Sequence, residues 1–255
     1  AHTHFTQGIA FYDLQQHRAS TLLYGQDAGV NCRSNDAFAL WFLGYPEQGL
    51  TRSQEAVTLA QQIGHPFSLS FILSIAADFH QLRREVNNAQ ESAEASINLA
   101  TDQGFPHWRA HGFVLRGSTL VHQGQVKDGI EQITEGLRTY RATGAELLRP
   151  YFLALLAEAH GVQGEPEAGL TALAEALTLV DTTGERWYAP ELYRLQGELR
   201  LRQASPDAAQ AAACFQQALA IARRQQAKSW ELRAAMSLSR LWQQQGKRAA
   251  AYALL

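Results

Sequence analysis

The residues that could carry chemistry are few, and the most suggestive pair is His107 and His111. Two histidines four positions apart share one face of a helix, where both imidazoles can reach one metal ion. None of the three residues between them is the glutamate that the HExxH motif of zinc enzymes requires. His107 also falls in the first turn of its expected helix and need not share the face of His111. We therefore predict neither a metal site nor a cofactor.

A nucleophilic site is equally poorly supported, because the sequence has no G-x-S-x-G motif and no persuasive cysteine–histidine pairing. Cys214, next to Phe215, is typical of a small core residue. His80, His122 and His160 fall near the ends of expected helices, where we expect them to cap carbonyl groups or to pack between repeats. The sequence therefore predicts no enzyme. A histidine-based hydrolase with an unrecognised site is the weaker alternative.

The densest group of aromatic and charged residues begins around Trp187 and Tyr188. Glu191, Arg194 and Glu198 follow at spacings of three and four, which place them on one face of a helix. One interpretation is a binding site for a partner. The favoured alternative is an exposed ladder of ion pairs, each contributing about a few tenths of a kcal/mol, with Trp187 packed between repeats. Adjacent Trp187 and Tyr188 are hard to explain unless one of them faces outward.

A glycine repeat indicates the helices that position these residues. One series with a spacing of forty residues is Gly64, Gly104, Gly144 and Gly184, and a second is Gly44, Gly124 and Gly164, with Arg84 at the vacant place. Two interleaved series indicate a repeat of two equal helices with a turn after each helix. Glycine suits such turns because the residue that follows a helix often needs a left-handed backbone.

The repeat predicts helix pairs along most of the chain. The expected pairs are 27–43 with 47–63, 67–82 with 86–103, 107–123 with 127–143, 147–163 with 167–183, 187–203 with 207–226, and 229–245 with 247 onward. A two-residue insertion at Ser205 and Pro206 moves the next turn to Gln226. Before the first pair we expect a helix over 3–12 that lacks a partner, and an irregular connection over 13–26.

Small residues recur where two paired helices would touch, as at Gly117, Gly136 and Gly197. A glycine inside a helix costs about 1 kcal/mol relative to alanine, so these positions indicate close contact between helix axes. The alternation of small and large residues resembles the tetratricopeptide repeat, in a longer form of about forty residues, over nearly the whole chain.

Particular segments are similar to the C-terminal repeat region of bacterial multidomain signalling proteins. These segments are LGYPEQGL, GHPFSLSFIL, FHQLRRE, TYRATGAEL, RPYFLALLAEAHG, GERWYAPELYRLQGELRL and KSWELRAAMSLSRLWQQQGK. Such proteins carry an N-terminal nucleotide cyclase, kinase or DNA-binding output domain and a central signal-transducing ATPase module. The resemblance implies an all-α, right-handed superhelix of about six helix pairs with a sensing or scaffolding role. No GxxxxGK[ST] motif is present, so ATPase or cyclase chemistry would belong to other parts of a longer chain.

In a tetratricopeptide solenoid the first helix of each pair lines the concave surface, and the resemblance therefore implies a groove. We expect it to bind a protein, a peptide or a small effector, and a possible partner is an ATPase or cyclase module of the same parent chain. The implied groove residues are Asn31, Ser34, Phe38, Trp41, Phe71, Asp78, His111, Ser118, Tyr151, Glu158, Trp187, Tyr188, Glu191, Arg194, Glu198, Arg233 and Arg240. The alternatives are solvated residues on a wide groove, or a scaffold that associates with itself.

Composition limits the partners and the compartment. The net charge of −2 provides no basic excess for nucleic acid, and no apolar run approaches the roughly 20 residues of a membrane helix. Cys32 and Cys214 are distant in sequence, and two unpaired cysteines fit a reducing cytoplasm. We expect one solenoid domain over 1–255. Its unpartnered first helix and incomplete last pair suggest a fragment of a longer chain.

Overall fold

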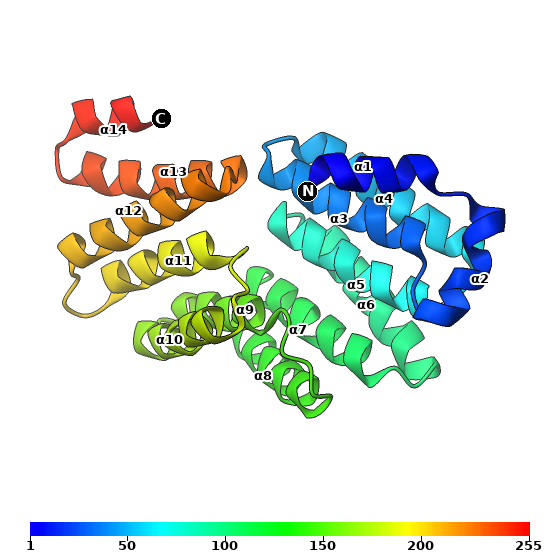
Figure 1. The fold of residues 1–255 in the computed structure, drawn as a ribbon. Helices are drawn as coiled ribbons and strands as arrows, with labels where there is room; N and C mark the ends of the chain where they lie inside the picture. Colours follow the sequence, from blue (N-terminus) through cyan, green and yellow to red (C-terminus); the bar gives the residue numbers. More distant parts are fainter. The chain divides into compact units, whose positions relative to one another are not determined.

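The computed structural model describes the backbone of residues 1–255, and the side chains of all of them except Arg18, Ala19, Ser20, Leu22 and Tyr24. Along this backbone the chain forms fourteen helices and no strand (Figure 1). The helices are α1 (His2–Phe11), α2 (Leu14–Tyr24), α3 (Ala28–Phe42), α4 (Pro46–Ile63), α5 (Pro66–Leu82), α6 (Val86–Asp102), α7 (Pro106–His122), α8 (Val126–Ala142), α9 (Arg149–Gln163), α10 (Pro166–Thr183), α11 (Ala189–Arg202), α12 (Ala208–Gln225), α13 (Lys228–Gln244) and α14 (Arg248–Leu254). The predicted all-α class is confirmed.

The helices form two compact units, Ala1–Ala145 with α1–α8 and Glu146–Leu255 with α9–α14. In both units consecutive helices pack as pairs: α3 with α4, α5 with α6 and α7 with α8 in unit 1, and α9 with α10, α11 with α12 and α13 with α14 in unit 2. The first helices of neighbouring pairs also touch, α3–α5–α7 in unit 1 and α9–α11–α13 in unit 2. The paired helices match the predicted ranges to within two residues at each end.

The turns between helices have the left-handed backbone that the two glycine series predict. Left-handed backbone is found at both glycine series, with φ between 69° at Gly64 and 90° at Gly44. Arg84, at the vacant place of the series, has φ 62°, and Gln226, to which the insertion moves the turn, has φ 57°. The turn geometry is therefore imposed by the repeat even where no glycine serves it, at a cost of roughly 1–2 kcal/mol for each non-glycine residue.

The glycines inside helices mark places where two helices nearly touch. A Cβ atom at Gly117 would lie 2.8 Å from the carbonyl oxygen of Gly129, and one at Gly197 would lie 2.5 Å from the ring of Phe215. Real Cβ atoms do not approach neighbours so closely, so a larger residue at either place would push the helices apart. The predicted close packing at these positions is confirmed.

The helix expected over 3–12 is found as α1 (His2–Phe11), but the expectation of an irregular connection over 13–26 was wrong. Residues 14–24 form α2, whose first turn is capped by the Asp13 side chain accepting from the backbone N–H of Gln16, and which ends at Gly25 with φ 72°. Asp before a helix and Gly after it are ordinary helix boundaries, but the segment lies outside the forty-residue pattern. The helix α1 also has a neighbour, because it packs along α3 with Gly8 against Cys32.

Candidate functional site

A network of charged side chains is centred on Glu191 in unit 2. Glu191 is only 1% exposed. Its two carboxylate oxygens accept from Arg194 Nε at 2.8 Å and Nη2 at 2.9 Å, and Arg233 Nη1 donates to the same carboxylate at 3.2 Å. The fork of two parallel bonds between Arg194 and Glu191 is the strongest geometry for such a pair. This carboxylate therefore holds two arginines of different helices in fixed positions.

The network is assembled from two adjacent first helices. Glu191, Arg194 and Glu198 lie along one face of α11, and Arg233 and Ser237 lie one turn apart on α13. Arg194 Nη1 donates to Glu198 Oε1 at 3.2 Å, and the Ser237 hydroxyl donates to the same oxygen at 2.7 Å. Glu191 is the third residue of α11 and follows Pro190, so it lies in the first turn of the helix.

The protonation of Arg194 follows from its neighbours. Burial by itself favours the neutral guanidine, but the carboxylates of Glu191, Glu198 and Glu158 outweigh burial and raise the pKa of Arg194. Arg194 therefore remains a cation inside the network at any physiological pH. Its charge is what keeps the buried carboxylate of Glu191 compensated.

Four aromatic rings pack beside this network. Tyr188 lies at their centre, with its ring centroid 4.9 Å from that of Tyr151, 5.0 Å from that of Trp187 and 5.1 Å from that of Trp230. The indole N–H of Trp230 donates to the backbone oxygen of Trp187 at 3.1 Å, and the indole N–H of Trp187 donates to Glu185 at 2.8 Å. Of the adjacent pair, Tyr188 is buried and Trp187 is half-buried. The rings thus form a rigid support for α11 and α13.

The ladder of ion pairs expected from the sequence is not fully exposed, since Glu191 is buried. Exposure increases away from Glu191: the side chain of Arg233 is 21% exposed, that of Glu198 is 28% exposed, and Arg240 is exposed. Among the described residues no hydrogen bond is made to Glu198 Oε2, while Oε1 accepts two. Glu198 is therefore a partly exposed carboxylate at the end of the network, and Arg194 and Ser237 both donate to its Oε1.

Unit 1 contains a buried polar pair of a different kind. His111 has no exposed surface, and its Nε2 lies 2.9 Å and 3.1 Å from the two carboxylate oxygens of Asp78, which is also buried. The rings of Trp108 and Tyr140 lie 6.0 Å and 6.4 Å from the imidazole. This pair links α5 to α7, and contact of either residue with a ligand stays a prediction.

His107 lies next to this pair without joining it. Its ring centroid is 4.4 Å from that of Trp108 and 4.7 Å from that of Tyr140. Burial, with a smaller contribution from the charge of His111, lowers the pKa of His107 to about 4. No group of three or more His, Cys, Asp or Glu residues that could hold a metal ion occurs among the described side chains.

The other implied groove residues of unit 1 are largely packed. Trp41 and Phe71 are buried, and Phe38 is half-buried with its ring edge-on to Phe79 at 5.7 Å. Ser34 and Ser118 are buried as well, and Asn31 is half-buried. In unit 2 Tyr151 is fully buried, whereas Glu158 is half-buried. Contact of any of these residues with a ligand stays a prediction.

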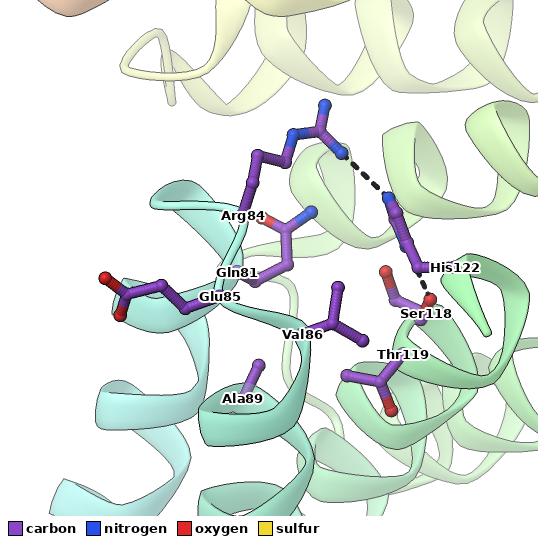
Figure 2. A pocket seen from close by; sticks show the side chains of 8 residues that line it. All are labelled: Gln81, Arg84, Glu85, Val86, Ala89, Ser118, Thr119 and His122. Atoms are coloured by element: carbon purple, nitrogen blue, oxygen red, sulfur yellow. Dashed lines mark hydrogen bonds between the residues drawn. The ribbon is translucent and has the colours of Figure 1, made fainter.

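A small hollow lies where the α5–α6 turn meets the end of α7 (Figure 2). His122 Nδ1 is 2.8 Å from the carbonyl oxygen of Ser118, and because a carbonyl only accepts, this nitrogen carries the proton. Arg84 Nη1, at 3.0 Å, then donates to His122 Nε2. Figure 2 shows the Arg84 side chain extending across the mouth toward His122.

The sequence did not single out this hollow, although the irregular residue Arg84 in the glycine series was a signal for it. The expectation that His122 caps a carbonyl is confirmed. The Nδ1 atoms of His80 and His160 pair instead with Glu85 at 2.6 Å and Glu165 at 2.9 Å, and the alternative that these histidines pack between repeats stays a prediction. In both cases the carboxylate follows five residues later, at the start of the next helix. Each of these histidines therefore links the end of a first helix to the start of the second helix of the same pair.

Comparison with known proteins supports the fold. No protein-family model matches the chain. An uncharacterized protein of Rhizobium meliloti (strain 1021) is 25% identical over 196 residues, which are 76% of this chain and 19% of that protein. The chain therefore spans about a fifth of that relative's length.

Three solved structures are similar at low sequence identity. The apo form of RapI has a TM-score of 0.64 at 11% identity, over 88% of this chain and 80% of RapI. A thermophilic TPR protein from Thermus thermophilus has a TM-score of 0.56 at 19% identity, over 82% of this chain and 98% of that protein. The chain has a tetratricopeptide-like repeat fold. A signal transduction ATPase with numerous domains and a tetratricopeptide repeat sensor, from Pyrococcus horikoshii, has a TM-score of 0.51 at 15% identity, over 86% of this chain and 34% of that protein.

The structure bears on two expectations drawn from composition, one about membrane helices and one about cysteines. No helix in the described part of the chain is both long and apolar enough to cross a membrane. Cys32 and Cys214 are both free thiols.

Proposed function

We propose that this chain is a non-catalytic recognition module and that the first-helix face of α11 and α13 binds a protein partner through an extended peptide. The observation that carries this proposal is the buried network of Glu191, Arg194 and Arg233, which fixes the partly exposed head groups of Glu198 and Arg233. A buried ion network contributes little net stability compared with apolar residues of the same size. A role in recognition gives these charges a purpose that packing alone does not.

The partner peptide carries a lysine or arginine side chain. The carboxylates of Glu158, Glu191 and Glu198 all act on Arg194, and Arg233 also donates to Glu191. The side chain of Glu198 is 28% exposed, and an incoming cation at its Oε2 would make a charge-assisted hydrogen bond worth about 1.5–3 kcal/mol. The half-buried indole of Trp187 offers a neighbouring apolar contact for the rest of the peptide.

Selection of a random peptide library on the immobilised protein tests this function. We expect the selected peptides to be enriched in lysine and arginine, and Glu198→Gln to weaken their binding by about tenfold or more. Glu167→Gln is the matched control, because Glu167 is an exposed carboxylate of the same unit at the start of α10. Peptides that bind both variants equally well, or a library that yields no binder, would contradict the proposal.

We further propose that the module belongs to a larger bacterial signalling protein, in which partner binding changes its contact with an ATPase module. This proposal is supported by the resemblance of the repeat segments, by the much longer bacterial relative and by the fold shared with the sensor-bearing ATPase. The test is deletion of this region from the parent protein. We expect the deletion to abolish the response of the output domain to the partner, and an unchanged response would refute the proposal.

A further inference from the structure

Four basic side chains gather at one end of unit 2, where the α12–α13 turn lies beside the loop that precedes α11. Arg223 and Arg224 are in the last turn of α12, and Lys228 is the first residue of α13. Arg186 lies in the loop. The side chains of Arg223 and Lys228 are 56% and 63% exposed, and Arg186 and Arg224 are also exposed. We call these four residues the basic surface.

Direct contacts hold the parts of the basic surface together. The side-chain amide of Gln225 donates to the backbone oxygen of Arg186 at 2.8 Å, which joins the end of α12 to the loop. Arg223 Nε and Lys228 Nζ donate to the two oxygens of one carboxylate, that of Glu231, at 2.9 Å and 2.8 Å. The four basic residues are therefore neighbours in space.

Little negative charge compensates this surface. Glu231 is the carboxylate that pairs with it, and among the described residues Arg186 and Arg224 form no ion pair. Glu185, next to Arg186 in the loop, accepts instead from uncharged N–H groups, among them the backbone N–H of Leu148 at 3.0 Å. The basic surface therefore carries more positive than negative charge.

The repeat itself does not require these charges. Lys228 and Arg186 hold the same repeat position, which in the earlier turns is occupied by Pro66, Pro106 and Glu146. The residues at the position of Arg224 in the earlier turns are all exposed, namely Gln62, Asp102, Ala142 and Thr182. Each of those turns is followed by a further helix pair, so exposure at this position belongs to the turn itself.

Helix stability explains only part of the basic surface. Positive charge in the last turn of a helix is favourable, which accounts for Arg223 and Arg224 at the end of α12. Positive charge at the start of a helix is unfavourable, and Lys228 begins α13. A role in binding gives this charge a purpose that the helix does not.

We propose that the basic surface binds an acidic segment of a partner polypeptide. Guanidinium groups match carboxylates in a fork of two parallel hydrogen bonds, so glutamate and aspartate side chains are the groups that Arg186 and Arg224 bind. The loop and the α12–α13 turn are held side by side before the segment arrives, so binding loses little conformational entropy there. The contact is charged and exposed, so its strength depends on salt.

A nucleic acid fits the basic surface less well. Proteins that bind a phosphate backbone tightly make about six to ten phosphate contacts. This surface has four basic residues, and Arg223 and Lys228 already pair with Glu231. The net charge of −2 on the whole chain also weakens the attraction of a long polyanion.

Fluorescently labelled hexaglutamate is a suitable probe, and hexaglutamine is its neutral counterpart. Binding to the full chain is measured by fluorescence polarisation at about 50 mM and at about 300 mM salt. We expect hexaglutamate to bind and hexaglutamine not to bind. We also expect the affinity for hexaglutamate to fall at least about fivefold at the higher salt concentration, because salt screens exposed charges.

Protein variants locate the site. The double variant Arg186→Gln, Arg224→Gln should lose about fivefold or more in affinity for hexaglutamate, and both residues are exposed, so the fold tolerates the change. Arg240→Gln, Arg248→Gln is the matched control, because it removes the same charge from exposed arginines of the same unit outside the basic surface. Glu198→Gln, which tests the proposed function, should not weaken this binding, so the two proposals fail separately.

Four results would overturn the inference. The first is no binding of hexaglutamate to the intact chain, and the second is an equal loss of affinity in the double variant and its matched control. The third is tighter binding of an oligothymidylate of similar charge that the double variant weakens, because a nucleic acid would then be the occupant. The fourth is a doubling of mass by light scattering that the double variant abolishes, because a second copy would then be the occupant.

Discussion

The two units place polar residues at the same positions of the repeat and use them differently. In unit 1 Asp78 of one first helix meets His111 of the next, and both are buried. In unit 2 the equivalent relation joins Glu198 to the helix of Arg233, and the network continues to the surface. We call the buried Asp78–His111 arrangement the closed pair, and the Glu191 network, which reaches the surface, the open network. The comparison teaches that a repeat position fixes where a side chain lies, while its neighbours decide whether that side chain is buried in a pair or partly exposed in a network.

The difference has a physical cause. Both oxygens of the Asp78 carboxylate lie within hydrogen-bond distance of His111 Nε2 in the same unit. The carboxylate of Glu191 instead binds two arginines, and Arg194 in turn needs Glu198. The network therefore extends from the buried Glu191 to Glu198, whose side chain is 28% exposed.

The largest expected effect comes from removing the Glu191 carboxylate at the centre of the open network. Glu191→Ala leaves the buried charge of Arg194 without its main partner, and we expect the free energy of unfolding to fall by about 3–5 kcal/mol. Urea denaturation followed by circular dichroism measures the loss. Glu167→Ala, at an exposed carboxylate, should change it by less than about 0.5 kcal/mol. A loss at Glu191 as small as that of the control would show that the network is not held together by this carboxylate.

A smaller effect is expected at the closed pair. Asp78→Ala leaves a buried imidazole without its acceptor, and the expected loss of unfolding free energy is about 1–3 kcal/mol. The same variant should bind the library-selected peptides as tightly as the wild type, because Asp78 belongs to the other unit. A loss of peptide affinity would mean that the two clusters do not have separate roles.

A pH titration sharpens the account of unit 1. The folded protein holds the pKa of His107 at about 4, below the ordinary value of 6.5. Between these values the unfolded chain binds a proton that the folded chain rejects. The contribution of His107 is therefore complete above pH 6.5 and is lost as the pH falls toward 4. We expect the melting temperature of His107→Phe to decline less between about pH 7 and about pH 4.5 than that of the wild type, and identical declines would contradict the assigned pKa.

The smallest expected effect is at Arg84 and Gln226, the two turn positions of the repeat at which the glycine is replaced. Gln226→Gly relieves a left-handed residue and should raise the free energy of unfolding by about 0.5–1 kcal/mol. Arg84→Gly relieves the same strain but removes the bond to His122, so we expect it to gain less. Denaturation midpoints of the two variants test this order. An equal gain would show that the Arg84 contact adds no stability.

The sequence alone predicted much of the fold because forty-residue spacing is directly visible in the glycines. It even placed the turns at Arg84 and Gln226. It missed α2, because that helix lies outside the repeat and only Asp13 and Gly25 mark its ends. A prediction from spacing fails where an element occurs once.

The candidate site was predicted in part. Helical spacing placed Glu191, Arg194 and Glu198 on one face, and the structure confirms their contacts. Spacing could not show that Glu191 is buried, because its second partner, Arg233, comes from another helix 42 residues away. Burial depends on such distant neighbours, which is why the exposed ladder was the favoured interpretation.

The most direct test of the proposed recognition face is hydrogen–deuterium exchange with a library-selected basic peptide bound. We predict slower amide exchange in α11 and α13, at Ala189–Arg202 and Lys228–Gln244, and unchanged exchange in α5 and α7 around Asp78 and His111. Protection confined to α5 and α7, or spread evenly over both units, would contradict the assignment of recognition to the open network.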